Sequence, residues 1–162
     1  MQSQYSDFFP KYLNDVSLIA DHQFKRIDIL YSDSYHMGIT ASEERFFLIK
    51  IRDDFTKLDS KDEMSKIYRK YILDLEKMKN PKFLTYYGMY YQRELMSYYL
   101  VFECPVNLFK NSIETASTDD RLMCVKSLFS VFSFLLRNGL TYPLFNNEDY
   151  YFINSNNNVK LL

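Results

Sequence analysis

The chain has 162 residues, of which 47% are hydrophobic and 25% are charged, with a formal net charge of -1. This balance fits a soluble globular protein of about one domain, and the 18% aromatic content supplies enough apolar surface to exclude long intrinsic disorder. The near-neutral charge excludes a broad electrostatic field that would attract nucleic acid or anionic lipid. The only glycines, Gly38, Gly88 and Gly139, lie far apart, so no run of glycine amides can wrap around a phosphate.

The cysteines, histidines and apolar stretches limit the cofactors and the compartment. Two Cys and two His residues occur at spacings that fit no four-ligand zinc site, so we expect no metal. Cys104 and Cys124 are isolated, which is typical of buried free thiols in a reducing compartment. No stretch reaches the roughly 18 uninterrupted apolar residues that span a bilayer, and the N-terminus does not resemble a secretory signal. We therefore expect a cytoplasmic protein with no membrane or nucleic-acid partner.

Hydrophobic spacing predicts the elements of the first two thirds of the chain. The spacing of Met64, Ile67, Tyr71, Leu75 and Met78 predicts an amphipathic helix that buries this stripe. Period-two alternation elsewhere is typical of strands. In chain order we expect a helix at 8–20, strands at 24–30, 37–41 and 46–51, a charged loop at 53–60, a helix at 62–79, and strands at 83–91 and 97–102.

The last third is expected to be mostly helical. Residues 108–113 favour a short helix. The cap Thr118-Asp119-Asp120 begins a longer helix, which runs through Arg137 and stops at Asn138-Gly139. The segments 150–153 and 159–162, joined by an Asn-rich turn, indicate a β-hairpin. This order predicts an α+β fold, with one helix packed on an antiparallel sheet and a helical region after it.

Paired tyrosines lie in the two strands after the amphipathic helix, at Tyr86-Tyr87, Tyr90-Tyr91 and Tyr98-Tyr99. Tyrosine is enriched at interfaces, which favours a binding surface. The simpler interpretation is that alternate residues of each strand face the core and the solvent.

Six segments carry local motifs in a recognisable order. They are Leu30–His36 at a loop between strands, Phe47-Leu48-Ile49-Lys50, Asn80-Pro81-Lys82-Phe83-Leu84, Tyr99–Pro105, Arg137-Asn138-Gly139-Leu140, and Asn154–Leu162. Together they resemble the protein-kinase fold over about residues 24–162. The second segment resembles the Val-Ala-Ile-Lys strand of that family, and the last resembles the hairpin that leads into its Asp-Phe-Gly motif.

The resemblance implies three parts. Residues 1–23 would form an N-terminal helical extension. Residues 24–103 would form a kinase-like N-terminal lobe, with a five-stranded antiparallel sheet and the C helix. Residues 104–162 would form the hinge and a truncated helical lobe, with the D and E helices and a β-hairpin. We expect truncation because the sequence stops just before the Asp-Phe-Gly position.

A nucleotide pocket would involve Lys50, Glu103 and Cys104, according to the resemblance. Lys50 matches the strand lysine, although an ordinary solvated lysine at a strand end has the same pattern. Glu103 and Cys104 match the hinge. The hinge N–H donor falls on Pro105, which has none, or on Cys104 if one residue is deleted. ATP binding is therefore a weak expectation, and no cofactor is predicted.

The side chains that surround a nucleotide in the family are altered here. Tyr31, Asp33 and His36 match the three loop glycines, so side chains fill the space of the phosphates. Phe102, at the gatekeeper position, would narrow the rear of the pocket.

The catalytic parts are also replaced. The position of the C-helix glutamate falls on Tyr71, and Asp74, one turn later, is a possible substitute partner for Lys50. The catalytic base position falls on Leu144 or Phe145, neither of which accepts a proton. Asp149 matches the position of the magnesium-binding Asn or is a turn residue. We therefore predict no enzymatic activity, because phosphoryl transfer needs the base and the metal ligands together.

The longest predicted helix, the E helix of the resemblance, is apolar on more than one face. We expect a protein partner or a second copy to cover it. The predicted partner-binding residues are Leu122, Val125, Phe129, Phe132 and Leu136. The alternative is that residues 1–23 fold back over this helix.

These observations predict a non-catalytic kinase-like interaction module, or pseudokinase, that serves as a scaffold or structural subunit of a larger assembly. Two alternatives remain open at this stage. One is a pseudokinase switch that still binds nucleotide through Lys50, and the other is a split kinase completed in trans by another chain.

Overall fold

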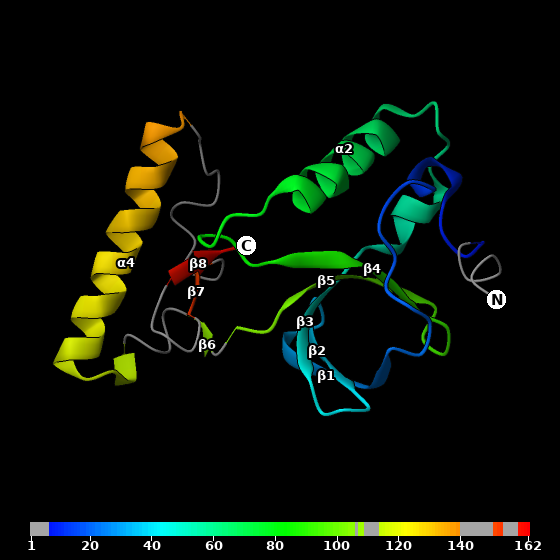
Figure 1. Ribbon diagram of the computed structural model, residues 1–162. Coiled ribbons are helices and arrows are strands. Elements are labelled where there is room, and N and C mark those ends of the chain that lie inside the picture. Colours follow the sequence, from blue (N-terminus) through cyan, green and yellow to red (C-terminus); the bar gives the residue numbers. More distant parts are fainter. Residues whose placement is uncertain (1–6, 106, 109–113, 140–150, 154–158) are drawn as a thin grey trace. The chain divides into compact units, whose positions relative to one another are not determined.

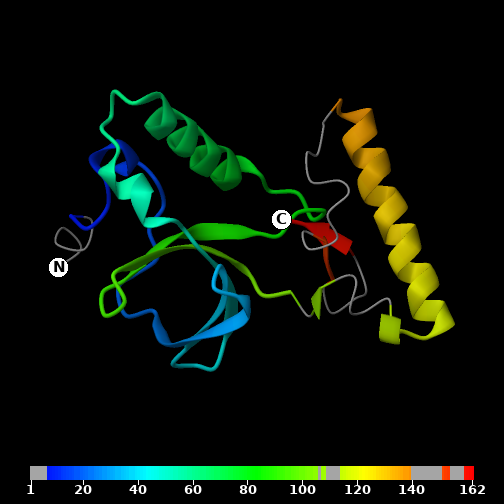
Figure 2. The same cartoon turned by 180° about the vertical axis from the view of Figure 1, so that it is seen from behind.

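The chain forms two compact units in the computed structural model. The structure describes residues 7–105, 107–108, 114–139, 151–153 and 159–162. The first unit comprises Met1–Lys79 and Thr85–Cys104, and the second comprises Asn80–Leu84 and Pro105–Leu162. Figures 1 and 2 show the elements from opposite sides.

The first unit is built on a five-stranded antiparallel sheet with strand order β1-β2-β3-β5-β4. Its strands are β1 (Phe24–Ser32), β2 (Tyr35–Thr40), β3 (Arg45–Lys50), β4 (Tyr86–Gln92) and β5 (Ser97–Glu103). The helix α2 (Glu63–Lys77) lies between β3 and β4 in the chain. The expected α+β class, the antiparallel sheet and its helix are confirmed.

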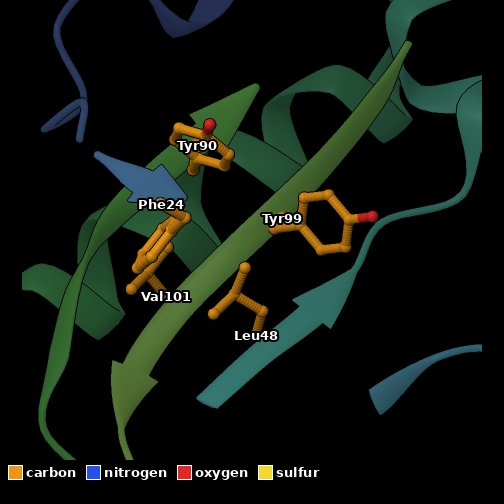
Figure 3. Packing of buried hydrophobic residues seen from close by; sticks show 5 residues of the cluster. All are labelled: Phe24, Leu48, Tyr90, Tyr99 and Val101. Carbon is orange, nitrogen blue, oxygen red and sulfur yellow. The ribbon is translucent and has the colours of Figure 1, made fainter. Parts of the chain in front are cut away.

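One face of this sheet closes on itself. Phe24 of β1 and Tyr90 of β4 belong to the two outermost strands, yet their ring centroids lie 4.9 Å apart in an edge-to-face contact. The sheet is therefore strongly curled, as twisted sheets tend to be. Figure 3 shows these rings packed with Leu48, Tyr99 and Val101 in one buried cluster.

The N-terminal segment covers another part of the sheet. Phe9 packs edge-on against Tyr91 and Tyr98, and the Tyr12 hydroxyl donates to the Phe55 carbonyl at 2.7 Å. Ile19 donates its N–H to the carbonyl of Met89 at 2.7 Å, so the segment also adds to the free edge of β4.

The helix expected at 8–20 is wrong, because only the 3-10 turn η1 (Lys11–Leu13) forms there. The apolar residues of this segment pack against the sheet in an irregular conformation. Their contacts join the segment to the first unit.

The tyrosine pairs follow from two-sided burial. Tyr90 and Tyr91 project from opposite faces of β4, and both are buried. Tyr99 is buried as well, whereas 45% of Tyr87 is exposed. The expected alternation between core and solvent is therefore wrong for Tyr90 and Tyr91, because the curl covers one face of the sheet and the N-terminal segment covers the other.

The orientation of α2 differs from the prediction. Its buried residues are Ser65 and Ile72, not the apolar stripe. Of the predicted stripe, Met64, Ile67, Tyr71 and Met78 are exposed, and Leu75 is half-buried. At 100° per residue the two sets lie about 120° apart around the helix. The apolar arc of α2 is thus wider than the face that is buried. The small Ser65 lies on the buried face.

The charged loop expected at 53–60 contains a short 3-10 helix, η2 (Asp53–Lys57). Its Phe55 is only 1% exposed and packs edge-on against Tyr98. A single aromatic residue among charged ones therefore anchors this segment to the sheet.

The second unit contains the long helix α4 (Thr118–Arg137) and a three-stranded sheet. Its strands are β6 (Asn107–Leu108), β7 (Tyr151–Ile153) and β8 (Val159–Leu161). The predicted hairpin is confirmed as the antiparallel pair β7 and β8. Of the short helix expected at 108–113, Leu108 lies in β6 and the other residues lie outside the described part.

The ends of α4 match their sequence signals closely. Ser117 is the N-cap, one residue before the predicted cap, and its Oγ accepts the Asp120 N–H at 3.2 Å. Asn138 ends the helix, and Gly139 follows with φ +60°, the left-handed conformation that glycine adopts without strain. Val131, Leu135 and Val159 form the buried cluster between α4 and β8.

Gly38 permits the close packing of the curled face. A Cβ atom at Gly38 would lie 2.7 Å from Cδ1 of Phe24 and 2.8 Å from Cδ1 of Leu48. We expect Gly38→Ala to lower the free energy of unfolding by about 1–3 kcal/mol, as overpacking of a core does. Urea denaturation measures the change. In a Leu48→Val background the same substitution should cost less, and equal costs would contradict the packing argument.

Candidate functional site

Lys50 occupies the last position of β3, opposite Tyr99 of β5. Its backbone N–H donates to the Ser34 carbonyl at 2.8 Å, and its side chain is exposed. Side chains alternate between the faces of a strand, so Lys50 projects from the same face as Leu48. That is the face of the curled cluster, where burial lowers the pKa of His36 and the nearby charge of Lys50 lowers it further.

The helix α2 packs on the other face. Tyr86 pairs with Phe102, their rings lie 5.3 Å apart, and Phe102 pairs with Phe47. Burial raises the pKa of the Tyr86 hydroxyl, and the nearby Glu76 of α2 adds to the increase. Residues that face α2 therefore include Phe47, the neighbour of Leu48 on β3.

The predicted lysine and the predicted helix residues consequently lie on opposite faces of the sheet. Asp74, the possible substitute partner of Lys50, lies 3.7 Å from the ammonium of Lys70 within its own helix. Tyr71 is half exposed. The structure does not bring Lys50 together with either residue.

Glu103 and Cys104 lie at the far end of the β3–β5 ladder from Lys50. Glu103 pairs with Phe46, four positions from Lys50, which corresponds to about 13 Å along a strand. Its carboxylate accepts the backbone N–H of Thr85 at 2.9 Å, while its own N–H donates to the Thr85 carbonyl at 2.9 Å. The Glu103 side chain therefore ties the end of β5 to the start of β4. Burial raises the pKa of the Cys104 thiol.

A shallow pocket of about 330 Å³ lies beside Lys50. It is lined by Asp33, Ser34, Lys50, Ile51 and Arg52. The Arg52 guanidinium lies 3.9 Å from the Asp54 carboxylate. The carboxylate of Asp33 shares this pocket with Lys50, so the local field for a phosphate is mixed. Ser34 and Arg52 were not predicted as pocket residues; Ser34 reaches Lys50 through the pairing of β2 with β3, whereas Arg52 lies two residues after Lys50 in the chain.

His36, at a position that matches a loop glycine, is buried with only 7% of its surface exposed. Its ring packs edge-on against Tyr99, with 5.3 Å between centroids, and its Nδ1 has no hydrogen-bond partner. Burial lowers the pKa of His36, and the positive charge of Lys50 lowers it further. A side chain thus fills the space that a glycine would leave open.

Four of the five predicted partner-binding residues of α4 are exposed, and the fifth is partly buried. Leu122 is 53% exposed, Phe129 66% and Leu136 80%. Val125 is also exposed, whereas Phe132 is partly buried and packs against the cluster under β8. The helix therefore has one apolar face that is covered and another that is exposed.

Several predicted features lie outside this geometry. The catalytic-base positions Leu144 and Phe145, and also Asp149, fall outside the described residues. Within the described part, no group of three or more His, Cys, Asp and Glu side chains could hold a metal ion. No helix among the described residues is long and apolar enough to cross a membrane. Cys104 and Cys124 are both free thiols, and Cys124 is buried.

Comparison with protein-family models and with curated proteins found no match to this chain. The kinase resemblance therefore rests on the motifs and on the order of the elements.

The buried imidazole of His36 makes stability depend on pH. Because its pKa is lowered in the folded state, the unfolded chain binds the proton more readily below about pH 6.5. Its contribution to the free energy of unfolding is complete above that pH and is lost as the pH falls. We expect a decrease of up to about 1.4 kcal/mol per pH unit below pH 6.5, measured by urea denaturation.

The matched variants for this experiment are His36→Phe and His22→Asn. Replacing His36 should flatten the wild-type dependence between pH 7 and the acid range. His22 has a side chain that is 85% exposed, so its replacement should leave the dependence unchanged. An identical slope in wild type and His36→Phe would contradict the assignment.

Proposed function

We propose that this chain is a kinase-like interaction module that performs no phosphoryl transfer and binds a protein partner through α4. In this role it would serve as a scaffold or structural subunit of a larger assembly. The order of elements supports the kinase-like part. Three antiparallel strands, α2, two further strands, a long helix and a hairpin follow one another as the resemblance implies.

The observation that carries the binding role is the second apolar face of α4. Leu122, Val125, Phe129 and Leu136 are exposed on a helix whose opposite side already packs on β8. Contiguous exposed apolar surface of this kind usually marks a protein-binding site, because its burial removes apolar area from water.

The surroundings of Lys50 support the absence of phosphoryl transfer. The ring of His36 occupies space that a glycine would leave for phosphates, and Asp33 places a carboxylate in the pocket of Lys50. Lys50 also projects from the face opposite α2, so it lacks the helix partner that orients the family's lysine. Transfer depends on positioning and on charge stabilisation, and both are weakened here.

Thermal unfolding with ATP tests the non-catalytic part. We expect no change in Tm on addition of ATP, with or without magnesium, because the described residues leave no site that favours a triphosphate over water. The same chain should transfer no phosphate from labelled ATP to itself or to a general acceptor protein.

Lys50→Ala is the control for this experiment. An ATP-dependent rise in Tm that disappears in Lys50→Ala would favour a nucleotide-binding switch over our proposal. Phosphate transfer that occurs only after a second chain is added would favour a split kinase. Transfer by the isolated chain, lost in Lys50→Ala, would overturn the proposal outright.

A further inference from the structure

Four exposed apolar residues of α4, together with the partly buried Phe132, have the spacing of a helix–helix seam. Leu122, Val125, Phe129, Phe132 and Leu136 recur at intervals of three, four, three and four residues. This is the a/d pattern of two heptads, which places the side chains on one stripe along the helix. The stripe is about 21 Å long at 1.5 Å per residue. Its natural occupant is therefore another helix with an apolar stripe of similar length.

The seam is distinct from the face that α4 uses within its own unit. The buried residues Cys124, Val131 and Leu135 centre about 120° around the helix from the seam. Phe132 lies between the two faces, and it packs against the cluster of Val131 and Val159. A second helix can consequently lie on the seam while α4 keeps its contact with β8.

We propose that α4 pairs with α4 of a second copy of this chain, antiparallel, about a two-fold axis at Phe129. This inference rests on the proposed function, in which α4 binds a protein, and it names that protein. A two-fold axis makes the seam complementary to itself, because a residue before the axis in one copy meets a residue after it in the other, and the same contact occurs a second time in reverse. Phe129 meets Phe129 and Leu122 meets Leu136. Val125, four residues before the axis, lies near the level of Phe132, three residues after it. Leu122, Phe129 and Leu136 occupy a positions of the heptad, and Val125 and Phe132 occupy d positions.

Charges beside the seam favour the antiparallel orientation. In a parallel pair, Arg121 at a g position would lie beside Lys126 at the following e position of the second copy. This repulsion between two positive charges would occur twice. In the antiparallel pair, Lys126 lies beside the uncharged Ser133 of the second copy.

The helix ends favour the same orientation. The first turn of α4 carries Asp119 and Asp120, and its last turn carries Arg137. Antiparallel pairing brings each acidic first turn near the basic last turn of the second copy. It also sets the two helix dipoles in opposite directions, which is the attractive arrangement.

A seam of two heptads is small, so the dimer should dissociate reversibly at low concentration. Contacts of this size fall in the class of weak interfaces, below the standard size of stable ones. Association by mass action is therefore the expected behaviour, and sedimentation over a range of concentrations detects it.

Sedimentation of the full chain gives the first test, with Phe129→Glu and Met123→Glu as a matched pair. The wild type should shift from monomer to dimer as its concentration rises. Phe129→Glu places two carboxylates against each other on the axis and should weaken the dimer by about tenfold or more. Met123 is also an exposed apolar residue of α4 but lies off the seam, so Met123→Glu should dimerise like the wild type.

Cysteine cross-linking tests the orientation. The background is Cys104→Ser with Cys124→Ala, whose circular dichroism must match the wild type. If that background fails to fold, the native cysteines are kept, and cross-links are assigned by mass spectrometry of the peptides. Phe129→Cys should form a disulfide-linked dimer on oxidation. Leu122→Cys alone should not, because its two copies would lie about 21 Å apart. A mixture of Leu122→Cys and Leu136→Cys should cross-link.

The outcomes separate this inference from the proposed function. A monomer at every concentration overturns self-pairing, and it leaves the seam to a different protein without bearing on phosphoryl transfer. Self-cross-linking of Leu122→Cys indicates a parallel pair and overturns the stated orientation. Equal loss of dimer in Phe129→Glu and Met123→Glu places the contact elsewhere and also overturns the inference. Phosphate transfer by the isolated chain overturns the proposed function alone.

Discussion

The alternation of side chains along β3 is the constraint on which the first unit depends. This strand lies between β2 and β5, so its register is fixed on both edges and each residue is committed to one face. Leu48 belongs to the curled cluster with Phe24, and Phe47 faces the side of α2 with Phe102. Lys50 inherits the face of Leu48. A shift of the register by one residue would move Lys50 to the face of α2. The same shift would exchange the buried positions of Phe47 and Leu48. The free-energy cost of that exchange holds the lysine on the face away from the helix.

Both helices illustrate a second principle, which is that an apolar stripe in a sequence does not say which part of it is covered. In α2 the most regular stripe is exposed, and contact with the sheet is made through Ile72 and the small Ser65. In α4 the covered face and the exposed seam are both apolar. A packed helix buries only the arc that its neighbours reach. A helix whose apolar arc is wider than its contact therefore leaves apolar surface in water. The proposed function of α4 is based on this exposed apolar surface.

The sequence predicted the elements whose signals are local. The strands, α2, the end of α4 at Asn138-Gly139 and the β7–β8 hairpin depend on alternation, caps and turn residues that neighbours along the chain determine. The N-terminal segment was mispredicted because its apolar residues pack individually on the sheet, which overrides their helical spacing. The resemblance placed Asp33 and Lys50 in one pocket, but the share of Ser34 in its lining was missed, because that depends on the pairing of β2 with β3. The burial of His36 likewise depends on the curl of the sheet, which no local pattern encodes.

Phe132 lies between the two faces of α4, so the proposed pairing would couple the packing of the second unit to association. It contributes to the cluster with Val131 and Val159, and it is also a d position of the seam. A helix on the seam, as proposed above, would pack against the side of Phe132 that the cluster leaves uncovered. The energy of binding then adds to the stability of α4 against β8, because a partner that binds only the folded helix shifts the folding equilibrium by mass action. In the proposed dimer, the contact between α4 and β8 and the occupancy of the seam would thus be linked through the side chain of Phe132.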